Sequence, residues 1–178
     1  MKKALLIASV LFIAVISTAC INNIAVQELN NKAAEFMQKG DYESAVNRLQ
    51  ASLDLDSTMY ETYYNLGIAA TNAKKYELAI ETLENGIKIK PEFANFYYSL
   101  AVAQAEFAET LLESNEKVDQ NTISENKSKS EELKTSAITN AQKYLELAPL
   151  AEDKEDVEEF IEDLKDEDSE KQTVVLEG

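Results

Sequence analysis

The chain has 178 residues, of which 45% are apolar and 28% charged, and it contains only four Gly and two Pro. A sequence so poor in turn-forming residues is typical of an all-α protein. Its net charge of −16 would repel nucleic acid. The absence of His and the presence of a single Cys exclude an internal disulfide and the common His and Cys metal sites. We therefore expect no nucleic-acid partner, no metal and no cofactor.

The first twenty residues have the pattern of a secretion signal. Lys2 and Lys3 precede an apolar run at residues 4–16, and small residues at 17–19 precede Cys20. The run of thirteen residues is shorter than the roughly 20 that a membrane span needs. Two alternatives are a plain secreted protein that is cleaved after Ala19 and keeps a free thiol, and a retained transmembrane anchor.

This arrangement resembles the lipobox of bacterial lipoproteins, although Ser17 stands where that motif usually has Leu, Val or Ile. The resemblance implies that residues 1–19 are a lipoprotein signal peptide and that Cys20 is acylated after cleavage. Residues 20–25 would then hold the lipidated Cys and a short tether to the bilayer. It also implies a place in the bacterial cell envelope. Ile21, in place of Asp, favours the periplasmic side of the outer membrane if the source has two membranes.

A repeat with a period of 34 residues follows the signal. Residues 40–46 align with residues 74–80, and Leu49 aligns with Leu83 in the same register. Pro91 closes the second copy. Each copy is therefore expected to form a helix, a short turn and a second helix.

The second copy resembles the tetratricopeptide repeat (TPR) in Tyr63, Leu66, Gly67 and Pro91, whereas Ala70 stands where an aromatic residue is usual. The resemblance implies an all-α, TPR-type α-solenoid of about three helix-turn-helix repeats and a C-terminal capping helix. The expected segments are repeats at 26–59, 60–93 and 94–149, a capping helix at 150–166 and an acidic, disordered tail at 167–178. A tail that only maintains solubility is the alternative to a functional one.

The third repeat is longer than the others. Its closing half at 137–149 matches residues 79–91 at a spacing of 58 instead of 34, so the repeat carries 24 additional residues. We place them at 108–131, as a prolonged hairpin that projects beyond the solenoid and contributes little core. The capping helix is predicted from an apolar stripe at Val157, Phe160, Ile161 and Leu164.

The TPR resemblance also implies a concave groove lined by the first helix of each repeat. The groove positions are Gln27, Asn30, Met37, Glu61, Tyr64, Asn65, Ile68, Asn72, Asn95, Tyr98 and Val102. No Lys or Arg occurs among them, which disfavours a ligand that ends in a carboxylate, even though Asn65 fits one position of the family's carboxylate clamp. We expect a protein or peptide partner with Tyr64 and Tyr98 as aromatic anchors. The alternative is that both Tyr side chains pack against the next helix and the groove binds nothing.

No catalytic residue is predicted. The many carboxylates are expected on helix faces, where no pair is set apart by its surroundings. The sequence has no base for a Ser nucleophile and no Gly-rich phosphate loop. We therefore expect a membrane-anchored adaptor that scaffolds a cell-envelope complex, and not an enzyme. The rival hypothesis is an accessory ligand-binding subunit of a solute-uptake system, which a closed apolar cavity would favour.

Overall fold

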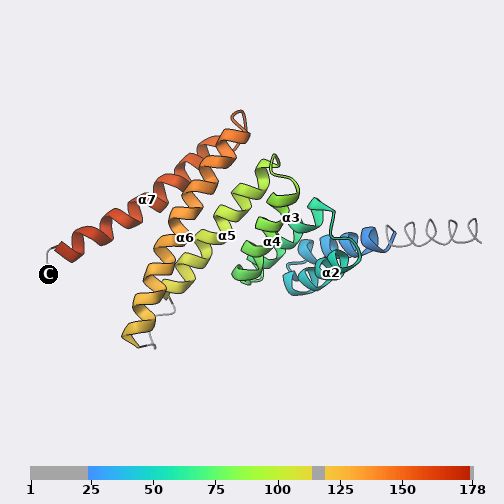
Figure 1. Ribbon diagram of the computed structural model, residues 1–178, viewed down its shortest axis with the longest axis horizontal. Helices are drawn as coiled ribbons and strands as arrows, with labels where there is room; N and C mark the ends of the chain where they lie inside the picture. The colour runs from blue at the N-terminus through green and yellow to red at the C-terminus, as the bar shows by residue number, and fades with distance from the viewer. Residues whose placement is uncertain (1–23, 114–118, 177–178) are drawn as a thin grey trace, which may run out of the picture.

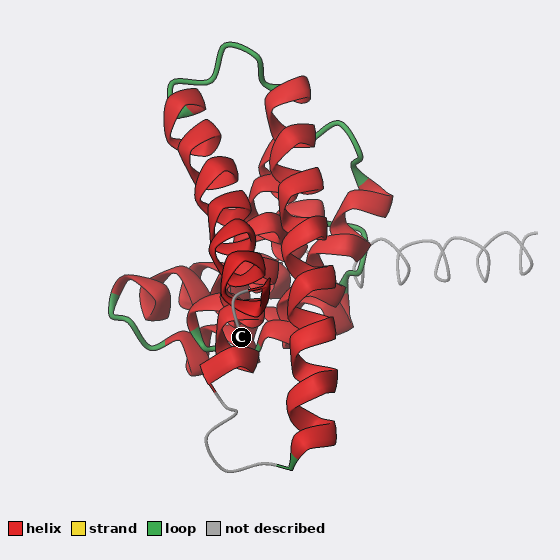
Figure 2. Cartoon of the chain, turned by 90° about the vertical axis from the view of Figure 1, so that its left-hand side faces the viewer, coloured by secondary structure: helices red, strands yellow, loops and turns green. Residues whose placement is uncertain are grey.

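The structure, a computed structural model, describes residues 24–113 and 119–176, with side chains up to residue 166. Every regular element within these ranges is a helix, and consecutive helices pack as antiparallel hairpins that stack side by side (Figures 1 and 2). The first helix covers residues 24–38. It is followed by α2 (Tyr42–Leu55), α3 (Tyr60–Asn72), α4 (Tyr76–Ile89), α5 (Ala94–Glu113), α6 (Gln120–Leu147) and α7 (Lys154–Leu176). The all-α, TPR-type solenoid is thus confirmed.

The first two hairpins close with the same turn, 34 residues apart. Gly40 and Lys74 have positive φ angles of 73° and 57°, which end the preceding helix in the left-handed region. After each of them a backbone N–H, that of Asp41 or Lys75, donates to the carbonyl oxygen five residues earlier, at 2.9 and 2.8 Å. The 34-residue period of the sequence is therefore also the spacing at which the same backbone turn recurs.

Small residues in the helices let the backbones approach. A Cβ atom on Gly67 of α3 would meet the side chain of Leu83 on α4, and one on Gly86 of α4 would meet the ring of Phe96 on α5. Leu83 and Phe96 are fully buried in a core that the first hairpins share. The size of these two large side chains thus requires glycine at the facing positions.

The third hairpin is prolonged, since α5 has 20 residues and α6 has 28 (Figure 1). Its base belongs to the packed interior, because Ala108 and Ser130 are buried and Lys129 Nζ lies 4.4 Å from the centre of the Phe107 ring. The expectation that residues 108–131 contribute little core therefore fails at both ends of that range, where Ala108 and Ser130 are buried. A helix that extends by whole turns keeps the same face toward its partner, so the first added turns remain packed.

The last helix, α7, covers the open side of α5 and α6. Val157, Ile161 and Leu164 are buried against Ala141 and Tyr144 of α6, in a second apolar cluster. The helix continues to Leu176, where a disordered tail was expected from residue 167. Residues 167–176 are mostly Glu, Lys, Gln, Val and Leu, several of them good helix formers, so the chain extends a helix that is already nucleated.

Candidate functional site

A small cavity lies between the first helix and α3, the first helices of two successive hairpins. Its volume is about 220 Å³, and it is lined by Gln27, Asn30, Asn31, Met59, Glu61, Thr62 and Asn65. Four of these seven, Gln27, Asn30, Glu61 and Asn65, are positions that the TPR resemblance assigned to the groove. The structure therefore brings together the groove residues of the first two repeats.

Asn30 holds the walls of this cavity. Its Nδ2 donates to the carbonyl oxygen of Val26 and to Oγ of Ser52, both at 2.9 Å, and its Oδ1 accepts from Oγ1 of Thr62 at 3.3 Å. Ser52 on α2 and Thr62 on α3 are fully buried. The amide of Asn30 thus joins three helices, and its hydrogen-bonding capacity is used within the protein. Its role is to position the cavity.

Asn31, Asn65 and Glu61 are polar groups of the lining that are available to a ligand, and Asn65 and Glu61 lie one turn apart on α3. Asn65 is half-buried, and no other described residue hydrogen-bonds to its side chain. Glu61, one turn earlier on α3, is exposed and is the only charged residue of the lining. An amide can donate to and accept from an extended peptide backbone, and a carboxylate can pair with a cation. The cavity thus places an amide that can bind a peptide backbone next to a carboxylate that can bind a cation.

Tyr64 packs against the start of the next hairpin. Its ring meets Phe93 and Phe96 edge-on, with centroids 5.3 and 5.8 Å away. Edge-to-face contacts of this kind stabilise aromatic clusters. The ring of Tyr64 is therefore one wall of the interface between two repeats, and only part of it is open to a partner.

Tyr98 packs in the same manner, further along the array. Its ring centroid lies 5.3 Å from that of Tyr144 and 6.1 Å from that of Phe160 on α7. Burial raises the pKa of the Tyr98 hydroxyl, and the charges of Asp153 and Asp156 raise it further. Both Tyr side chains thus pack against neighbouring helices, because α5 and α7 cover the face on which the two rings lie. This packing is the one expected by the alternative interpretation of the two Tyr residues.

The remaining predicted groove residues lie on the same helices outside the cavity. Asn72 and Asn95 are exposed, and Nδ2 of Asn72 donates to the carbonyl oxygen of Ile68 in its own helix at 2.9 Å. Ile68 and Val102 are half-buried, and Met37 packs against the first apolar cluster. They lie on the first helix, α3 and α5, and none of them lines the cavity.

Sequence reasoning missed Asn31, Met59 and Thr62. Met59 immediately precedes α3, at a position where no side-chain capping bond forms, and it lines the cavity. Thr62 reaches the cavity floor through its bond to Asn30. Asn31 could have been inferred from the sequence, because it directly follows the predicted groove residue Asn30. The other two depend on the angle between helices, which the repeat pattern does not specify.

Cys20, the candidate acylation site, lies outside the described residues, as do the signal segment and residues 20–23 of the tether. Within the described ranges, no helix is long and apolar enough to cross a bilayer. The same ranges contain no cluster of three His, Cys, Asp or Glu side chains that could hold a metal ion.

Comparison with known proteins supports the repeat assignment. Residues 33–70 and 71–106 match the family model described as TPR repeat, so the chain contains TPR repeats. No curated protein matches the sequence at a significant level.

Solved structures of TPR domains share the fold at low sequence identity. The first TPR domain of human RPAP3 aligns with a TM-score of 0.61 and 14% identity, over 82% of this chain and 95% of that one. The second TPR domain of human RPAP3, in complex with the HSP70 peptide SGPTIEEVD, gives 0.59 and 13%, over 79% and 98%. The Yersinia enterocolitica type III secretion chaperone SycD, in complex with a peptide of the translocator YopD, gives 0.57 and 18%, over 82% and 93%. These likenesses show the fold, and the three domains differ from this chain in most residues.

Proposed function

We propose that this TPR array is a membrane-anchored adaptor of the bacterial cell envelope, which binds an extended segment of another envelope protein in the cavity between the first helix and α3. The observation that carries the proposal is the lining of that cavity, where Asn65 is unpaired among the described residues and stands beside Glu61. Two of the structurally similar proteins, a TPR domain and a secretion chaperone, are in complex with peptides, which supports a peptide as the class of ligand.

The charge of the cavity defines the kind of segment. Glu61 is acidic and no Lys or Arg lines the cavity, so a ligand with a terminal carboxylate would meet repulsion. A segment with a Lys or Arg would pair with Glu61, while an adjacent apolar side chain contacts Met59. Asn65 would hold the backbone of the bound segment. The ligand is therefore an internal, basic and partly apolar stretch of a protein.

The volume of this cavity argues against a small solute as its ligand. Pockets for small molecules usually enclose about 300–1,000 Å³ and are mostly apolar. This cavity measures about 220 Å³ and is lined largely by amides, a hydroxyl and a carboxylate. It fits part of a peptide better than a whole solute.

The anchoring part of the proposal depends on Cys20. It is the only Cys, and it follows an apolar run and three small residues. Acylation there would hold the module at the membrane, with the outer membrane as the proposed site in a cell that has two. In cells fed a fatty-acid probe, the protein should incorporate the label and the Cys20→Ala variant should not. Equal labelling of both proteins would refute the anchoring.

A photo-crosslinking residue in place of Asn31 tests the binding site in cells. Asn31 lines the cavity, whereas Glu84, a matched exposed position on α4, lies on the second helix of a hairpin. We expect the probe at 31 to capture a discrete partner that mass spectrometry identifies, and the probe at 84 to capture none. The same yield from both positions would show that the cavity is not the interface.

A further inference from the structure

Five large apolar side chains of the described residues are exposed to solvent. They are Ile24, Leu55, Ile89, Leu147 and Leu150. Isolated exposed apolar residues are normal on protein surfaces, so their number alone indicates nothing. Their distribution over the fold is not random, however.

All five lie at one edge of the solenoid. Ile24 begins the described part of the first helix, while Leu55, Ile89 and Leu147 are the last residues of α2, α4 and α6. Leu150 is in the loop that follows α6. In an antiparallel hairpin the start of the first helix and the end of the second meet at the same edge. Figure 1 shows this edge along the upper right of the molecule, where the loops after α2, α4 and α6 follow one another toward the start of the first helix. We name these five residues the apolar edge.

The opposite edge, as far as the structure describes it, has no exposed large apolar side chain. There the turns between paired helices carry polar and charged residues, among them Lys39, Asp41, Lys74, Lys75 and Asp119. Because both edges consist of helix ends and short loops, their shape does not explain the difference. The two edges are therefore expected to face different surroundings.

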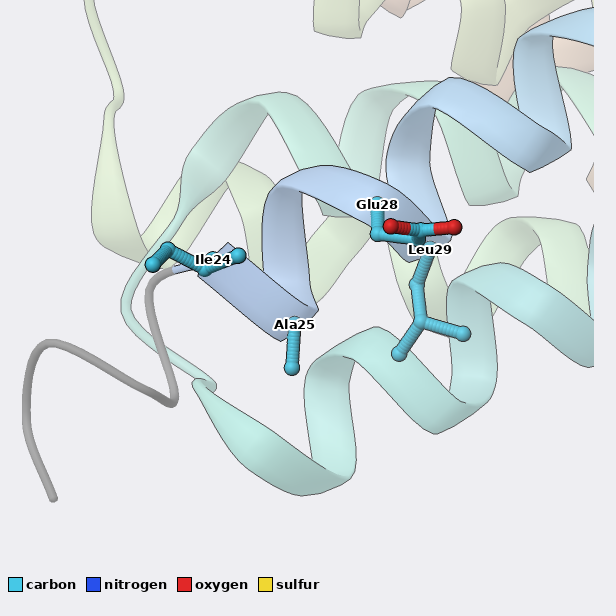
Figure 3. A pocket seen from close by; sticks show the side chains of 4 residues that line it. All are labelled: Ile24, Ala25, Glu28 and Leu29. Atoms are coloured by element: carbon cyan, nitrogen blue, oxygen red, sulfur yellow. The ribbon is translucent and has the colours of Figure 1, made fainter.

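Ile24 lies at the end of the apolar edge that is nearest to Cys20 in the sequence. Ile24 is 66% exposed, and a hollow beside it is lined by Ile24, Ala25, Glu28 and Leu29 (Figure 3). Only three residues separate Ile24 from Cys20. Such a segment reaches at most about 14 Å when fully extended. An acyl chain on Cys20 would hold this end of the edge at the bilayer surface.

We infer that the apolar edge rests on the lipid bilayer, so that the helices of the solenoid point away from the membrane surface. This inference rests on the proposed acylation of Cys20. Leu150, which is 95% exposed, would insert at the far end of the edge, and Leu55, Ile89 and Leu147 would contact lipid between the two ends. Met59 and Glu61 bring one end of the cavity to this edge. Asn30, Asn31 and Asn65 lie further along the helices, where the cavity remains open to a protein partner.

Polar groups of this edge fit a membrane interface. The hydroxyls of Tyr63 and Tyr97 donate to the carbonyl oxygens of Ser57 and Pro91, at 3.2 and 3.0 Å, which fixes an aromatic ring close to each of two loops. Tyr side chains are enriched at the level of lipid headgroups. A second copy of the chain is a poor occupant, because each copy has a net charge of −16.

The charges near the edge predict which lipids it prefers. Asp56, Glu92 and Glu152 lie in the three loops, and Lys90 is the one cation there, with Nζ 3.7 Å from the centre of the Tyr60 ring. The excess of carboxylates favours zwitterionic over anionic lipid. Phosphatidylcholine vesicles should therefore support the contact better than vesicles that contain phosphatidylglycerol.

The test uses the lipidated, full-length protein in phosphatidylcholine vesicles. With Cys20 acylated, a Cys introduced at Ile89 or Leu150 is the single free thiol and takes a fluorescent label. Asn72→Cys, an exposed position at the opposite edge, is the matched control. Nitroxide-bearing lipid reports contact with the bilayer, and iodide reports contact with water. We expect labels at 89 and 150 to be quenched by the lipid at least about twofold more than the label at 72, which iodide should quench best.

The other outcomes separate the two proposals. Mass spectrometry that finds no acyl chain on Cys20 overturns the anchoring and the edge with it. If the protein is acylated but iodide quenches the labels at 89 and 150 as strongly as the label at 72, the anchoring holds and the proposed contact between the apolar edge and the bilayer is wrong. Labels shielded from iodide but not quenched by the lipid would show that a protein covers the edge, which also overturns the bilayer as its occupant.

Discussion

The hydroxyl of Tyr144 donates a hydrogen bond of 2.6 Å to Oδ1 of Asp153. Tyr144 is nearly buried near the end of α6, and Asp153 immediately precedes α7. The bond therefore fastens the last helix of the array to the long hairpin. Since α7 also covers Tyr98 and the apolar face of α6, this bond acts together with the apolar cluster to hold the end of the solenoid closed.

Replacing Tyr144 by Phe should lower the free energy of unfolding by about 2 kcal/mol, because a hydrogen bond to a charged group contributes about 1.5–3 kcal/mol net. The bond and burial raise the pKa of Tyr144 from 10.0 to about 12. A raised pKa means that the folded protein keeps a proton that the unfolded chain releases first. The stabilisation is complete below pH 10 and declines as the pH rises from 10 toward 12.

Urea denaturation at several pH values measures this effect. The difference in stability between the natural protein and Tyr144→Phe should shrink above pH 10. Tyr97→Phe is the control, since its hydroxyl bonds an exposed, neutral carbonyl oxygen and its loss should cost no more than about 0.5 kcal/mol. A difference that does not change between pH 8 and pH 11.5 would contradict the linkage.

Tyr98→Ala should destabilise the protein by about 2 kcal/mol, because it removes ring contacts to Tyr144 and Phe160 at a half-buried site. Asn95→Ala, an exposed change in the same helix, should leave the melting temperature nearly unchanged. Thermal melts followed by circular dichroism make the comparison. Equal melting temperatures for the two variants would mean that Tyr98 is a surface residue, available as a binding anchor.

The sequence predicted this fold well because the repeat pattern records packing directly. Gly67 and Leu83 occupy repeat positions that fix the distance between two helices, and Pro91 marks where a hairpin ends. The roles of Tyr64 and Tyr98 were harder to predict. Their positions on the first helices were correct, but α5 and α7 also cover that face, and the angle at which a neighbouring helix crosses does not follow from helical periodicity.

Gly86→Ala should cost at least about 2 kcal/mol, although alanine is the better helix former by about 1 kcal/mol. The new Cβ would collide with the Phe96 ring, which is fully buried and cannot move aside without disturbing the core. Gly40→Ala is the control, because no heavy atom lies within 4 Å of its Cβ position. Its positive φ angle should cost only about 1–2 kcal/mol. A Gly86→Ala variant as stable as the natural protein would show that the two helices separate easily.

The tip of the third hairpin should be dispensable, whereas its base should not. Asn126 Nδ2 donates to the carbonyl oxygen of Leu111 at 3.4 Å, which marks where the two helices still meet below the tip. Replacing residues 112–125 by a short glycine-rich turn should change the free energy of unfolding by less than about 1 kcal/mol. Deletion of residues 108–131 should cost more, since it removes the buried Ala108 and Ser130.

Chemical denaturation of the two deletions separates these roles. If both fold as stably as the natural protein, the whole insertion is outside the core. If both fail to fold, the tip contributes to stability through contacts made by its own residues.

Asn30 and Asn65 share the cavity, yet their alanine variants should fail in different ways. Asn30→Ala would leave the buried hydroxyls of Ser52 and Thr62 without their partner, at a cost of about 2 kcal/mol in stability. Asn65→Ala breaks no bond within the described part of the chain, so its melting temperature should stay unchanged. If Asn65 holds the backbone of a bound segment, this variant should weaken binding of the captured partner about 10-fold, equivalent to about 1.4 kcal/mol. Stability by urea denaturation and affinity by titration of the partner distinguish the two effects. Unchanged affinity in Asn65→Ala would place the interface elsewhere on the array.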